Sequence, residues 1–400
     1  VRPYLFRPMI DTPESLRDVV ERVRQRARVA IDTEFVWERT YYPRLGLVQL
    51  GVDEDETYLV DAVALKDLSP LGPLLSDEHT VKILHDARQD LTILRRASGA
   101  SPQRVFDTRV AAGFVGLSAT LSLQAVVQET VGVTLPKGEQ RSDWVRRPLS
   151  DEQIAYAHSD VRYLPRAYET LRRWAEERGR LRWVEEEMRL LDDPALYEED
   201  DPRERYHSVK SRAKRGFGRR DYAVLREVTA WREQVARDHD RPRKHVVPDD
   251  VLVDLARRKP TAEADLDRVR GLSGKARDRY GEAMVEAVRR GLDVPKSEQP
   301  RPPQSRRPDE TLTPRLDLAQ ALLRGRGLRD GVDPTLVATR ADVEALVAAG
   351  PDADADHHAL LRGWRRAFIG ADLLALMQGD NAVGLDPEEG LPRIVGNGRS

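Results

Sequence analysis

Strand and helix patterns of apolar and polar residues are mixed in the first 200 residues. Short apolar segments that end at acidic or turn residues are typical of buried strands. Five segments are predicted as strands, at residues 28–35, 45–52, 57–60, 81–84 and 104–106. Helical spacing predicts helices at 87–96, 121–129 and along the long run 151–178. Strands first and helices later predict an α/β domain, with a mixed sheet flanked by helices.

The second half of the chain shows helical spacing alone. In residues 218–293, apolar residues at 224, 228, 231 and 235 fall on one helical face, and further helices are predicted at 249–256 and 276–290. Residues 310–400 are also predicted to be all helical. Their segment DPTLVATRADVEALV echoes DDVLVDLARRKP of the preceding block, which suggests a diverged repeat.

Two changes in composition divide the chain. An acidic stretch that turns basic spans residues 192–220, and residues 294–309 (VPKSEQPRPPQSRRPD) are too rich in proline and polar residues to build a core. We therefore expect four segments: a first domain at 1–205, a helical domain at 218–293, a linker at 294–309 and a second helical domain at 310–400.

Composition narrows the chemistry that is available. The 66 basic residues nearly balance the 68 acidic ones, so a nucleic-acid-binding surface would have to be local. The absence of cysteine excludes disulfides, thiolate metal sites and a cysteine nucleophile. The sequence has no apolar run of ~20 residues. The first residues, VRPYLFRPMI, lack the apolar stretch of a signal peptide, so we expect a cytoplasmic protein.

The first candidate for chemistry is the pair Asp32 and Glu34, at the end of the first predicted strand. Residues i and i+2 of a strand point to the same side, so the two carboxylates project together. Two such groups repel each other unless a cation lies between them, and hard oxygen ligands suit Mg²⁺ or Mn²⁺. Taken alone, an Asp-x-Glu pair is more often a solvated strand edge.

Two more acidic positions follow at a strand-to-helix junction and on a late helix. Asp90 comes one helical turn after His85 and Asp86, and Asp86 could simply cap that helix. Tyr156 and Asp160 are four residues apart on a predicted helix, so they share one face. Each position alone has an ordinary structural explanation.

The order and spacing of these residues resemble the tyrosine branch of the DEDD exonuclease superfamily. The matching residues are Asp32, Glu34, Asp90, Tyr156 and Asp160. The histidine branch would need histidine five positions before Asp160, where this chain has Ala155. The segments TYYPRLGLVQLG, at 40–51, and LPKGEQRSDWVRRPLSDEQIAYAHSDVRYL, at 135–164, narrow the resemblance to the ribonuclease D family.

This resemblance implies a fold and an activity. The first domain is expected to be ribonuclease H-like (DnaQ-like), and residues 218–293 and 310–400 resemble two all-α HRDC-type domains. The expected activity is 3′→5′ exoribonuclease hydrolysis of single-stranded RNA 3′ ends, such as tRNA precursors, by a monomer. Four carboxylates would hold two Mg²⁺ or Mn²⁺ ions while Tyr156 orients the attacking water, and the products would be nucleoside 5′-monophosphates.

Further residues are candidates for supporting roles. Lys137, Gln140, Trp144 and Arg147 are candidate substrate contacts, although packing explains Trp144 and salt bridging explains the others equally well. Asp107 and His85 are expected to support the site. Phosphate contacts of the helical domain could come from Arg241, Arg243, Lys244, Arg257, Arg258, Lys259 and Lys275, or these could be ordinary surface charges.

Two alternatives stay open at this point. Nothing in the carboxylates reads a 2′-hydroxyl, so a DNA 3′→5′ exonuclease of the same branch fits the residues as well. A non-catalytic nucleic-acid-binding protein on the same fold is the other alternative, and the complete set of four acids and Tyr156 argues against it.

Overall fold

The computed structural model describes residues 9–136, 138–139, 142–209, 216–301 and 310–396. The chain forms two compact units. The first unit combines Val1–Glu34, Leu45–Tyr197 and Arg307–Ser400, and the second combines Phe35–Arg44 with Glu198–Arg306. Within the described ranges, no helix has both the length and the apolar character needed to cross a bilayer.

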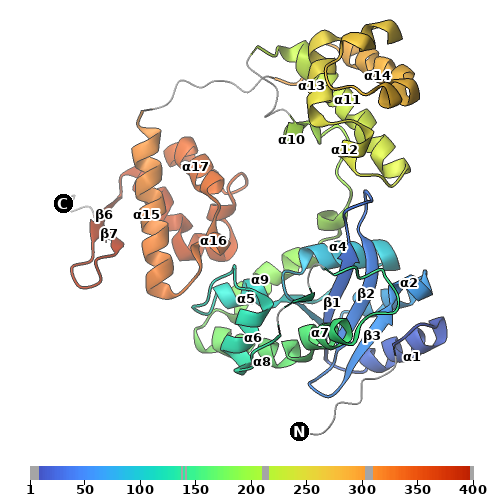
Figure 1. The fold of residues 1–400 in the computed structure, drawn as a ribbon. Helices are drawn as coiled ribbons and strands as arrows, with labels where there is room; N and C mark the ends of the chain where they lie inside the picture. The colour runs from blue at the N-terminus through green and yellow to red at the C-terminus, as the bar shows by residue number, and fades with distance from the viewer. Residues whose placement is uncertain (1–8, 137, 140–141, 210–215, 302–309, 397–400) are drawn as a thin grey trace. The chain divides into compact units, whose positions relative to one another are not determined.

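The first unit is built on a five-stranded mixed sheet in the order β3-β2-β1-β4-β5 (Figure 1). The strands are β1 (Arg28–Val36), β2 (Arg44–Gly51), β3 (Thr57–Asp61), β4 (Val81–Leu84) and β5 (Val105–Asp107). β2 and β3 are antiparallel, while β4 runs parallel to both β1 and β5. All five predicted strands are present, and the predicted mixed sheet is confirmed.

Alternation along the strands separates two cores. Val29 and Ile31 of β1 pack on one face of the sheet with helix α1 (Pro13–Arg24) and helix α4 (Arg88–Ser98). Ala30 packs on the other face, where the helices are α5 (Thr108–Gly113), α6 (Leu123–Val131), α7 (Asp151–Arg162), α8 (Leu164–Glu177) and α9 (Leu181–Arg189). Asp32 and Glu34 have the same parity as Ala30, so they lie on the face covered by α7.

Two helices of this unit differ from the prediction. Helix α1 was not predicted, although Thr12 caps it and its buried face repeats at Leu16, Val19, Val20 and Val23. The predicted long helix 151–178 is two helices that meet at Tyr163, because Pro165 occupies the first turn of α8. Helix α7 itself begins at a capping box between Ser150 and Gln153.

The C-terminal part of the first unit is helical as far as Gln378. Its helices include α15 (Leu312–Asp330), α16 (Pro334–Val337), α17 (Arg340–Ala349) and α19 (Ala371–Gln378). The all-α prediction for 310–400 is wrong at its end, where β6 (Asn381–Leu385) and β7 (Pro392–Gly396) form an antiparallel hairpin. Val383 pairs with Ile394, and Asp386 accepts hydrogen bonds from the amides of Glu388 and Glu389 in the turn.

The second unit is a helical domain joined by the loop Phe35–Arg44. Its helices are α10 (Tyr206–Val209), α11 (Arg219–Asp238), α12 (Arg243–Val246), α13 (Asp249–Arg258) and α14 (Gly274–Asp293). A long helix, a four-residue helix and a ten-residue helix occur in this order as α11-α12-α13 and again as α15-α16-α17, in agreement with the suggested repeat.

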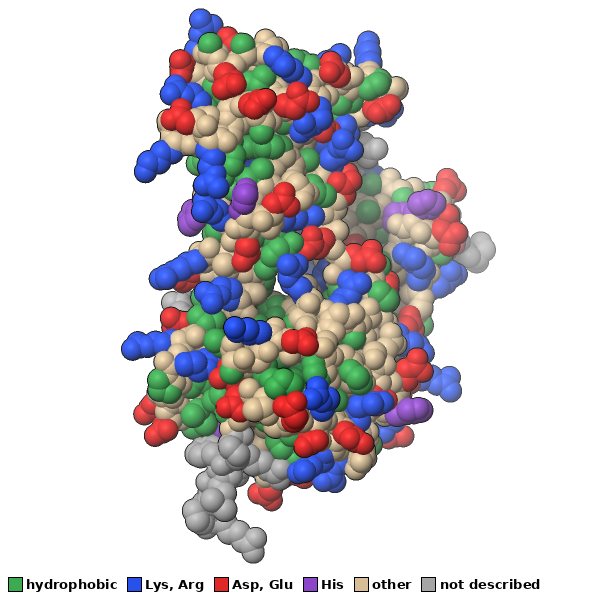
Figure 2. Space-filling view, turned by 90° about the vertical axis from the view of Figure 1, so that its right-hand side faces the viewer, with side chains coloured by type: hydrophobic (Ala, Val, Ile, Leu, Met, Phe, Trp, Pro, Cys, Tyr) green, Lys and Arg blue, Asp and Glu red, His purple; other side chains and the backbone are tan. Residues whose placement is uncertain are grey.

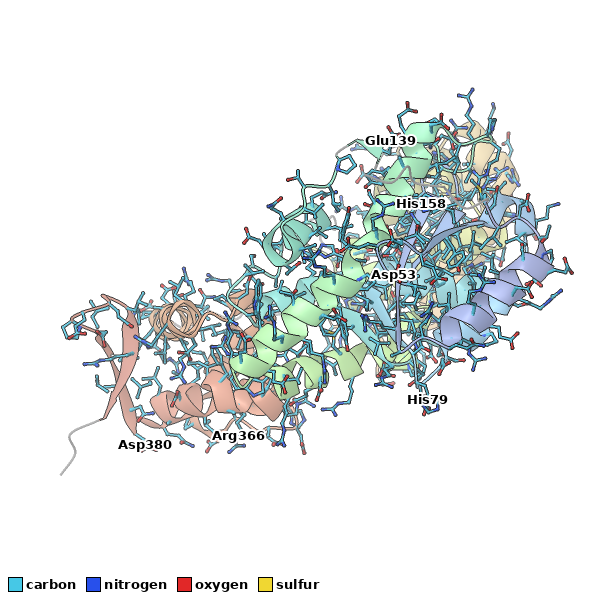
Figure 3. The ribbon with its side chains drawn as sticks, turned by 90° about the horizontal axis from the view of Figure 1, so that it is seen from below. Asp53, His79, Glu139, His158, Arg366 and Asp380 are labelled. Carbon is cyan, nitrogen blue, oxygen red and sulfur yellow. The ribbon has the colours of Figure 1, made fainter. Side chains whose placement is uncertain are left out.

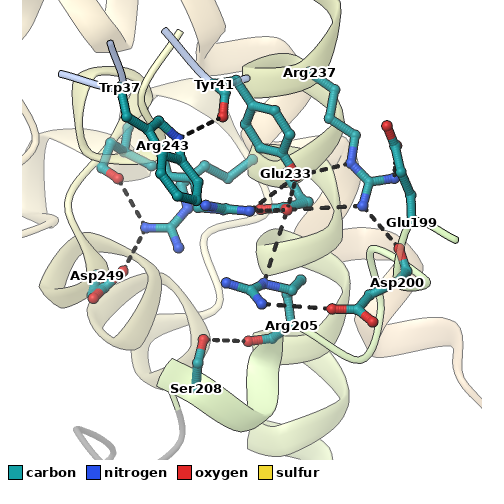
Figure 4. A network of polar contacts seen from close by, with 12 residues as sticks. Trp37, Tyr41, Glu199, Asp200, Arg205, Ser208, Glu233, Arg237, Arg243 and Asp249 are labelled. Carbon is teal, nitrogen blue, oxygen red and sulfur yellow. Dashed lines mark hydrogen bonds and ion pairs between the residues drawn. The ribbon is translucent and has the colours of Figure 1, made fainter. Parts of the chain in front are cut away.

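The loop is fixed to this helical domain through Tyr41 (Figure 4). Its hydroxyl donates to the buried Glu233 and accepts from Arg243 Nη2 at 2.9 Å and Arg237 Nε at 3.0 Å. The Arg243 guanidinium lies 4.5 Å from the centre of the Tyr41 ring and bonds Glu233 Oε1 and Oε2 at 2.7 and 2.6 Å. Asp240 Oδ1 accepts from the amides of Tyr41 and Tyr42, each at 3.0 Å. The loop is therefore held by both side-chain and backbone contacts.

Candidate active site

Three of the predicted carboxylates meet on the α7 face of the sheet. Asp32, Glu34 and Asp160 each offer one oxygen, and these three oxygens lie within 4.8 Å of one another. Strand alternation brings the first two together, while α7, which crosses in front of β1 to β3 in Figure 1, carries the third. Tyr156, one turn before Asp160, is buried and donates a hydrogen bond to its carboxylate.

Asp90 joins this group from the other side of β1. It lies in the first turn of α4, is buried, and its carboxylate accepts a hydrogen bond from the Thr33 hydroxyl. Thr33 stands between Asp32 and Glu34. The same strand segment therefore lies next to Asp160 through its two carboxylates and next to Asp90 through Thr33. The negative charge of Asp90 also raises the pKa of Asp32. The structure thus brings together all five predicted catalytic residues.

The pKa values of all four acids are raised, which means that ionising the four carboxylates together is unfavourable when no cation is bound. Burial, and then the charges of Asp90, Asp160 and Glu34, raise the pKa of Asp32 well above its usual value. Burial, followed by the charges of Asp160 and Asp90, raises the pKa of Glu34 to about 9. Burial also raises the pKa values of Asp90 and Asp160 to about 7. A bound cation would remove this penalty by stabilising the ionised forms.

The residues present fit a divalent metal ion. Oδ1 of Asp160 is buried and has no hydrogen-bond partner among the described residues, which leaves it available as a ligand. The donor set consists of carboxylate oxygens, the ligands that Mg²⁺ and Mn²⁺ prefer over softer metals. Asp32, Tyr156 and Asp160 line a pocket of about 370 Å³.

Asp107 and His85 support this pocket by fixing its backbone. Asp107 caps α5 and accepts hydrogen bonds from the amides of Asp86 and Ala87, at 3.1 and 2.8 Å, just before α4. His85 bridges Thr108 Oγ1 and the carbonyl of Leu121, at 3.0 and 3.1 Å. Asp86 does not cap α4 with its side chain; it has a positive φ of 61° and pairs with Arg109.

The candidate substrate contacts have different outcomes. Arg147 binds Asp61 through Nε at 2.7 Å and through Nη2 at 2.6 Å, and Nη2 also donates to the Gly46 carbonyl at 2.7 Å. Trp144 is only 1% exposed, so neither face of its ring is open to a base. The structure therefore favours the salt-bridge explanation for Arg147 and the packing explanation for Trp144. Lys137 and Gln140 lie outside the described residues.

Sequence reasoning missed one wall of the pocket. Thr120, Leu121, Ser122, Leu123 and Gln124 line it beside the carboxylates, from the segment that leads into α6. The serine and threonine residues of this segment and the N-cap position of Ser122 are a signal for a turn before a helix. They are not a signal for a pocket wall, because that role depends on where the turn packs.

The cations predicted for phosphate binding are divided between two roles. Arg243, Arg258 and Lys259 pair with Glu233, Asp254 and Asp221, respectively, and Arg257 stacks over Phe217. Arg241, Lys244 and Lys275 instead line a groove of about 450 Å³ together with His245, Arg279 and Tyr280. In residues 216–301, as described, these three cations have no ion-pair partner. Elsewhere basic and acidic side chains are interspersed, as on the face in Figure 2.

Comparisons with known proteins agree with this site. Residues 8–175 match the family described as 3'-5' exonuclease, and residues 221–288 match the HRDC domain. With the mixed sheet and the acidic cluster, the first match defines a 3′→5′ exonuclease.

The relatives narrow this class to one family. The chain is 39% identical to ribonuclease D of Desulfotalea psychrophila over 363 residues, covering 90% of this chain and 96% of the relative. It is also 39% identical to ribonuclease D of Gluconacetobacter diazotrophicus over 383 residues, or 94% of each protein. The crystal structure of Escherichia coli RNase D matches with a TM-score of 0.81 at 30% identity, over 93% of this chain and 98% of that one. The chain belongs to the ribonuclease D family, and the predicted exoribonuclease class and ribonuclease H-like fold with an HRDC domain are confirmed.

Proposed function

We propose that this exoribonuclease removes nucleotides from the 3′ ends of single-stranded RNA, tRNA precursors among them, through Asp32, Glu34, Asp90, Tyr156 and Asp160. The observation that carries the proposal is the convergence of carboxylate oxygens of Asp32, Glu34 and Asp160 within 4.8 Å, with Oδ1 of Asp160 buried and lacking a hydrogen-bond partner among the described residues. We further propose that the protein acts as a cytoplasmic monomer with the domain limits predicted above, except that the loop Phe35–Arg44 belongs with the helical domain.

The four carboxylates would hold two divalent cations, Mg²⁺ or Mn²⁺, which when bound supply charge neutralisation and an activated water. Tyr156 lies one helical turn before Asp160, and its hydroxyl donates a hydrogen bond to the Asp160 carboxylate. We therefore assign this hydroxyl the role of orienting a water molecule at the metal-binding face. A free tyrosine has a pKa near ~10, so orientation rather than proton removal is the role proposed for this hydroxyl. Hydrolysis with this polarity releases nucleoside 5′-monophosphates.

The test compares wild type with Asp32→Asn and with Glu21→Gln, an exposed carboxylate on α1. We expect release of 5′-monophosphates from single-stranded RNA that needs Mg²⁺ or Mn²⁺, stops with chelator, and falls at least ~1000-fold in Asp32→Asn only, since a shared metal ligand is lost. Calorimetric titration with Mn²⁺ should show the lost metal site directly. Undiminished hydrolysis and Mn²⁺ binding in Asp32→Asn would contradict the proposal. A matched DNA oligomer in the same assay separates RNA from DNA preference.

The helical domain of the second unit is proposed to bind the RNA backbone in the groove of Arg241, Lys244 and Lys275. These cations have no ion-pair partner within residues 216–301 as described, so they provide charge for phosphates, and Tyr280 at the groove provides an aromatic ring. Arg241→Ala with Lys244→Ala should weaken binding of long RNA and reduce its salt dependence, while Arg258→Ala, whose guanidinium already pairs with Asp254, should not. Equal effects of the two variants would show that the groove is not the binding surface.

A further inference from the structure

The non-helical part of this wall of the active-site pocket belongs to a short segment, Ser118–Ser122, between α5 and α6, and Leu123 and Gln124 of α6 continue the wall. Thr120, Leu121 and Ser122 of this segment face the same pocket as Asp32, Tyr156 and Asp160. The segment Ser118–Ser122 has no regular secondary structure, so its position depends on contacts with its neighbours.

On the pocket side, two side chains hold the wall. His85 Nε2 bonds the Leu121 carbonyl at 3.1 Å, and Arg109 Nε donates to the Ala119 carbonyl at 2.8 Å. Arg109 also pairs with Asp86, which lies on the pocket as well. These contacts fix the carbonyls of the wall but leave its amides and hydroxyls to other partners.

On the opposite side, the partner comes from the C-terminal part of the chain. Asp333 Oδ2 accepts from the Ala119 amide at 2.7 Å and from the Ser118 hydroxyl at 2.9 Å. The Ser118 hydroxyl is in turn 2.8 Å from that of Thr120, which faces the pocket. The backbone amide of Asp333 donates to the Gly113 carbonyl at 2.8 Å. The second carboxylate oxygen of Asp333, Oδ1, caps α16.

Asp333 is itself held firmly by the packing around it. Arg180 donates to the carbonyls of Phe114, at 2.8 Å, and Gly331, at 3.0 Å. It thereby links the end of α5 to the residues just before Asp333. Gly113 is packed so closely on Leu336 that an added Cβ would come within 2.5 Å of it. A firmly held carboxylate therefore meets a part of the pocket wall that has no regular secondary structure.

We propose that Asp333 is a positioning residue for catalysis: it fixes the wall Ser118–Ser122 so that Thr120, Leu121 and Ser122 shape the pocket for the 3′-terminal nucleotide. The C-terminal helices thus complete the active site. This inference rests on the proposed function of the pocket. It also means that a deletion of the C-terminal helices would remove a support of the pocket.

The experiment compares Asp333→Ala with Glu187→Gln. Glu187 fixes the same C-terminal helices to the nuclease residues, by two 2.8 Å bonds from Arg365 and one of 2.9 Å from Trp364, without touching the wall. Both variants should lower the melting temperature. Only Asp333→Ala should lower kcat/KM for a dinucleotide, by roughly 10- to 100-fold for two charge-assisted hydrogen bonds, and Asp333→Asn should restore part of it.

Hydrogen exchange at the Ala119 amide gives a readout that does not need activity. It should quicken in Asp333→Ala and stay slow in Glu187→Gln. The inference is overturned if dinucleotide hydrolysis is unchanged in Asp333→Ala, or if both variants lose activity to the same extent. If wild type itself hydrolyses nothing, the proposed function fails, whereas the exchange rates still decide whether Asp333 holds the wall.

Discussion

Replacing Arg147 by lysine should destabilise the protein and leave its affinity for RNA unchanged. The guanidinium makes two bonds to Asp61, one to the Gly46 carbonyl and one to the Trp144 carbonyl, at 2.6 to 2.9 Å. The side chain of Asp61 is 9% exposed and that of Arg147 is 23% exposed, so water replaces these bonds poorly. A lysine keeps the charge but cannot form the bidentate pair or reach both carbonyls.

The expected loss follows from these contacts. Breaking a fully buried ion pair costs roughly 3–5 kcal/mol, and the retained charge and partial exposure of the lysine reduce this to about 2 kcal/mol. Such a change lowers the folding equilibrium constant about 30-fold. The measurement is urea unfolding of wild type, Arg147→Lys and Arg146→Lys, an exposed neighbour that serves as the control.

The same proteins are then titrated with single-stranded RNA at two salt concentrations. If Arg147 binds phosphate instead of supporting the fold, Arg147→Lys will unfold at the wild-type urea concentration while its dissociation constant for RNA rises. That pair of results would refute the structural role. An Asp61→Asn variant adds a second check, because its effect and that of Arg147→Lys should not be additive.

Two further predictions concern the packing of α7 on the sheet. His158, labelled in Figure 3, lies on α7 with Nδ1 2.7 Å from Thr57 Oγ1, and burial lowers its pKa to about 4. The unfolded chain then binds a proton between pH ~6.5 and ~4 that the folded protein does not, so stability should fall by up to about 3 kcal/mol as pH drops through this window, and His158→Asn should flatten that fall in urea unfolding. A Cβ on Gly51 would lie 2.6 Å from the carbonyl oxygen of Val161, the residue after Asp160, so Gly51→Ala should displace α7. Loss of activity with a lowered melting temperature is expected, compared with Gly274→Ala, where an added Cβ meets nothing within 4 Å and the position is exposed. An active, stable Gly51→Ala would contradict the close packing.

The strands could be predicted because their signals are local, whereas the five catalytic candidates were identified by the family resemblance of their order and spacing, since each position alone has an ordinary explanation. Asp32 and Glu34 share a face by alternation, and Tyr156 and Asp160 share one by helical spacing. The hairpin β6–β7 was missed because its strands are short and only partly buried, with little apolar pattern to detect. The break between α7 and α8 had a local signal in Pro165, which begins a helix readily but disrupts its interior.

The pocket wall could not be predicted, because its support comes from far away in the sequence. Asp333 and Ala119 are 214 positions apart, and neither has a pattern that distinguishes it from an ordinary helix cap or turn residue. Arg147 is a similar case. Its charge suggested a ligand contact, and only the packing of Asp61 and Gly46 around it shows that its hydrogen bonds are made within the protein.

The loop anchored by Tyr41 has a consequence for how such proteins can be recombined. The chain leaves the strand that carries Asp32 and Glu34, contributes Phe35–Arg44 to the helical unit, and returns to form most of β2. A single cut near residue 205 therefore cannot excise the helical unit intact, since one of its buried aromatic residues would stay behind. Exchange of this unit between homologous genes would have to carry the loop and its partners Glu233 and Arg243 together, so we expect chimaeras with a single crossover to inherit an unmatched network.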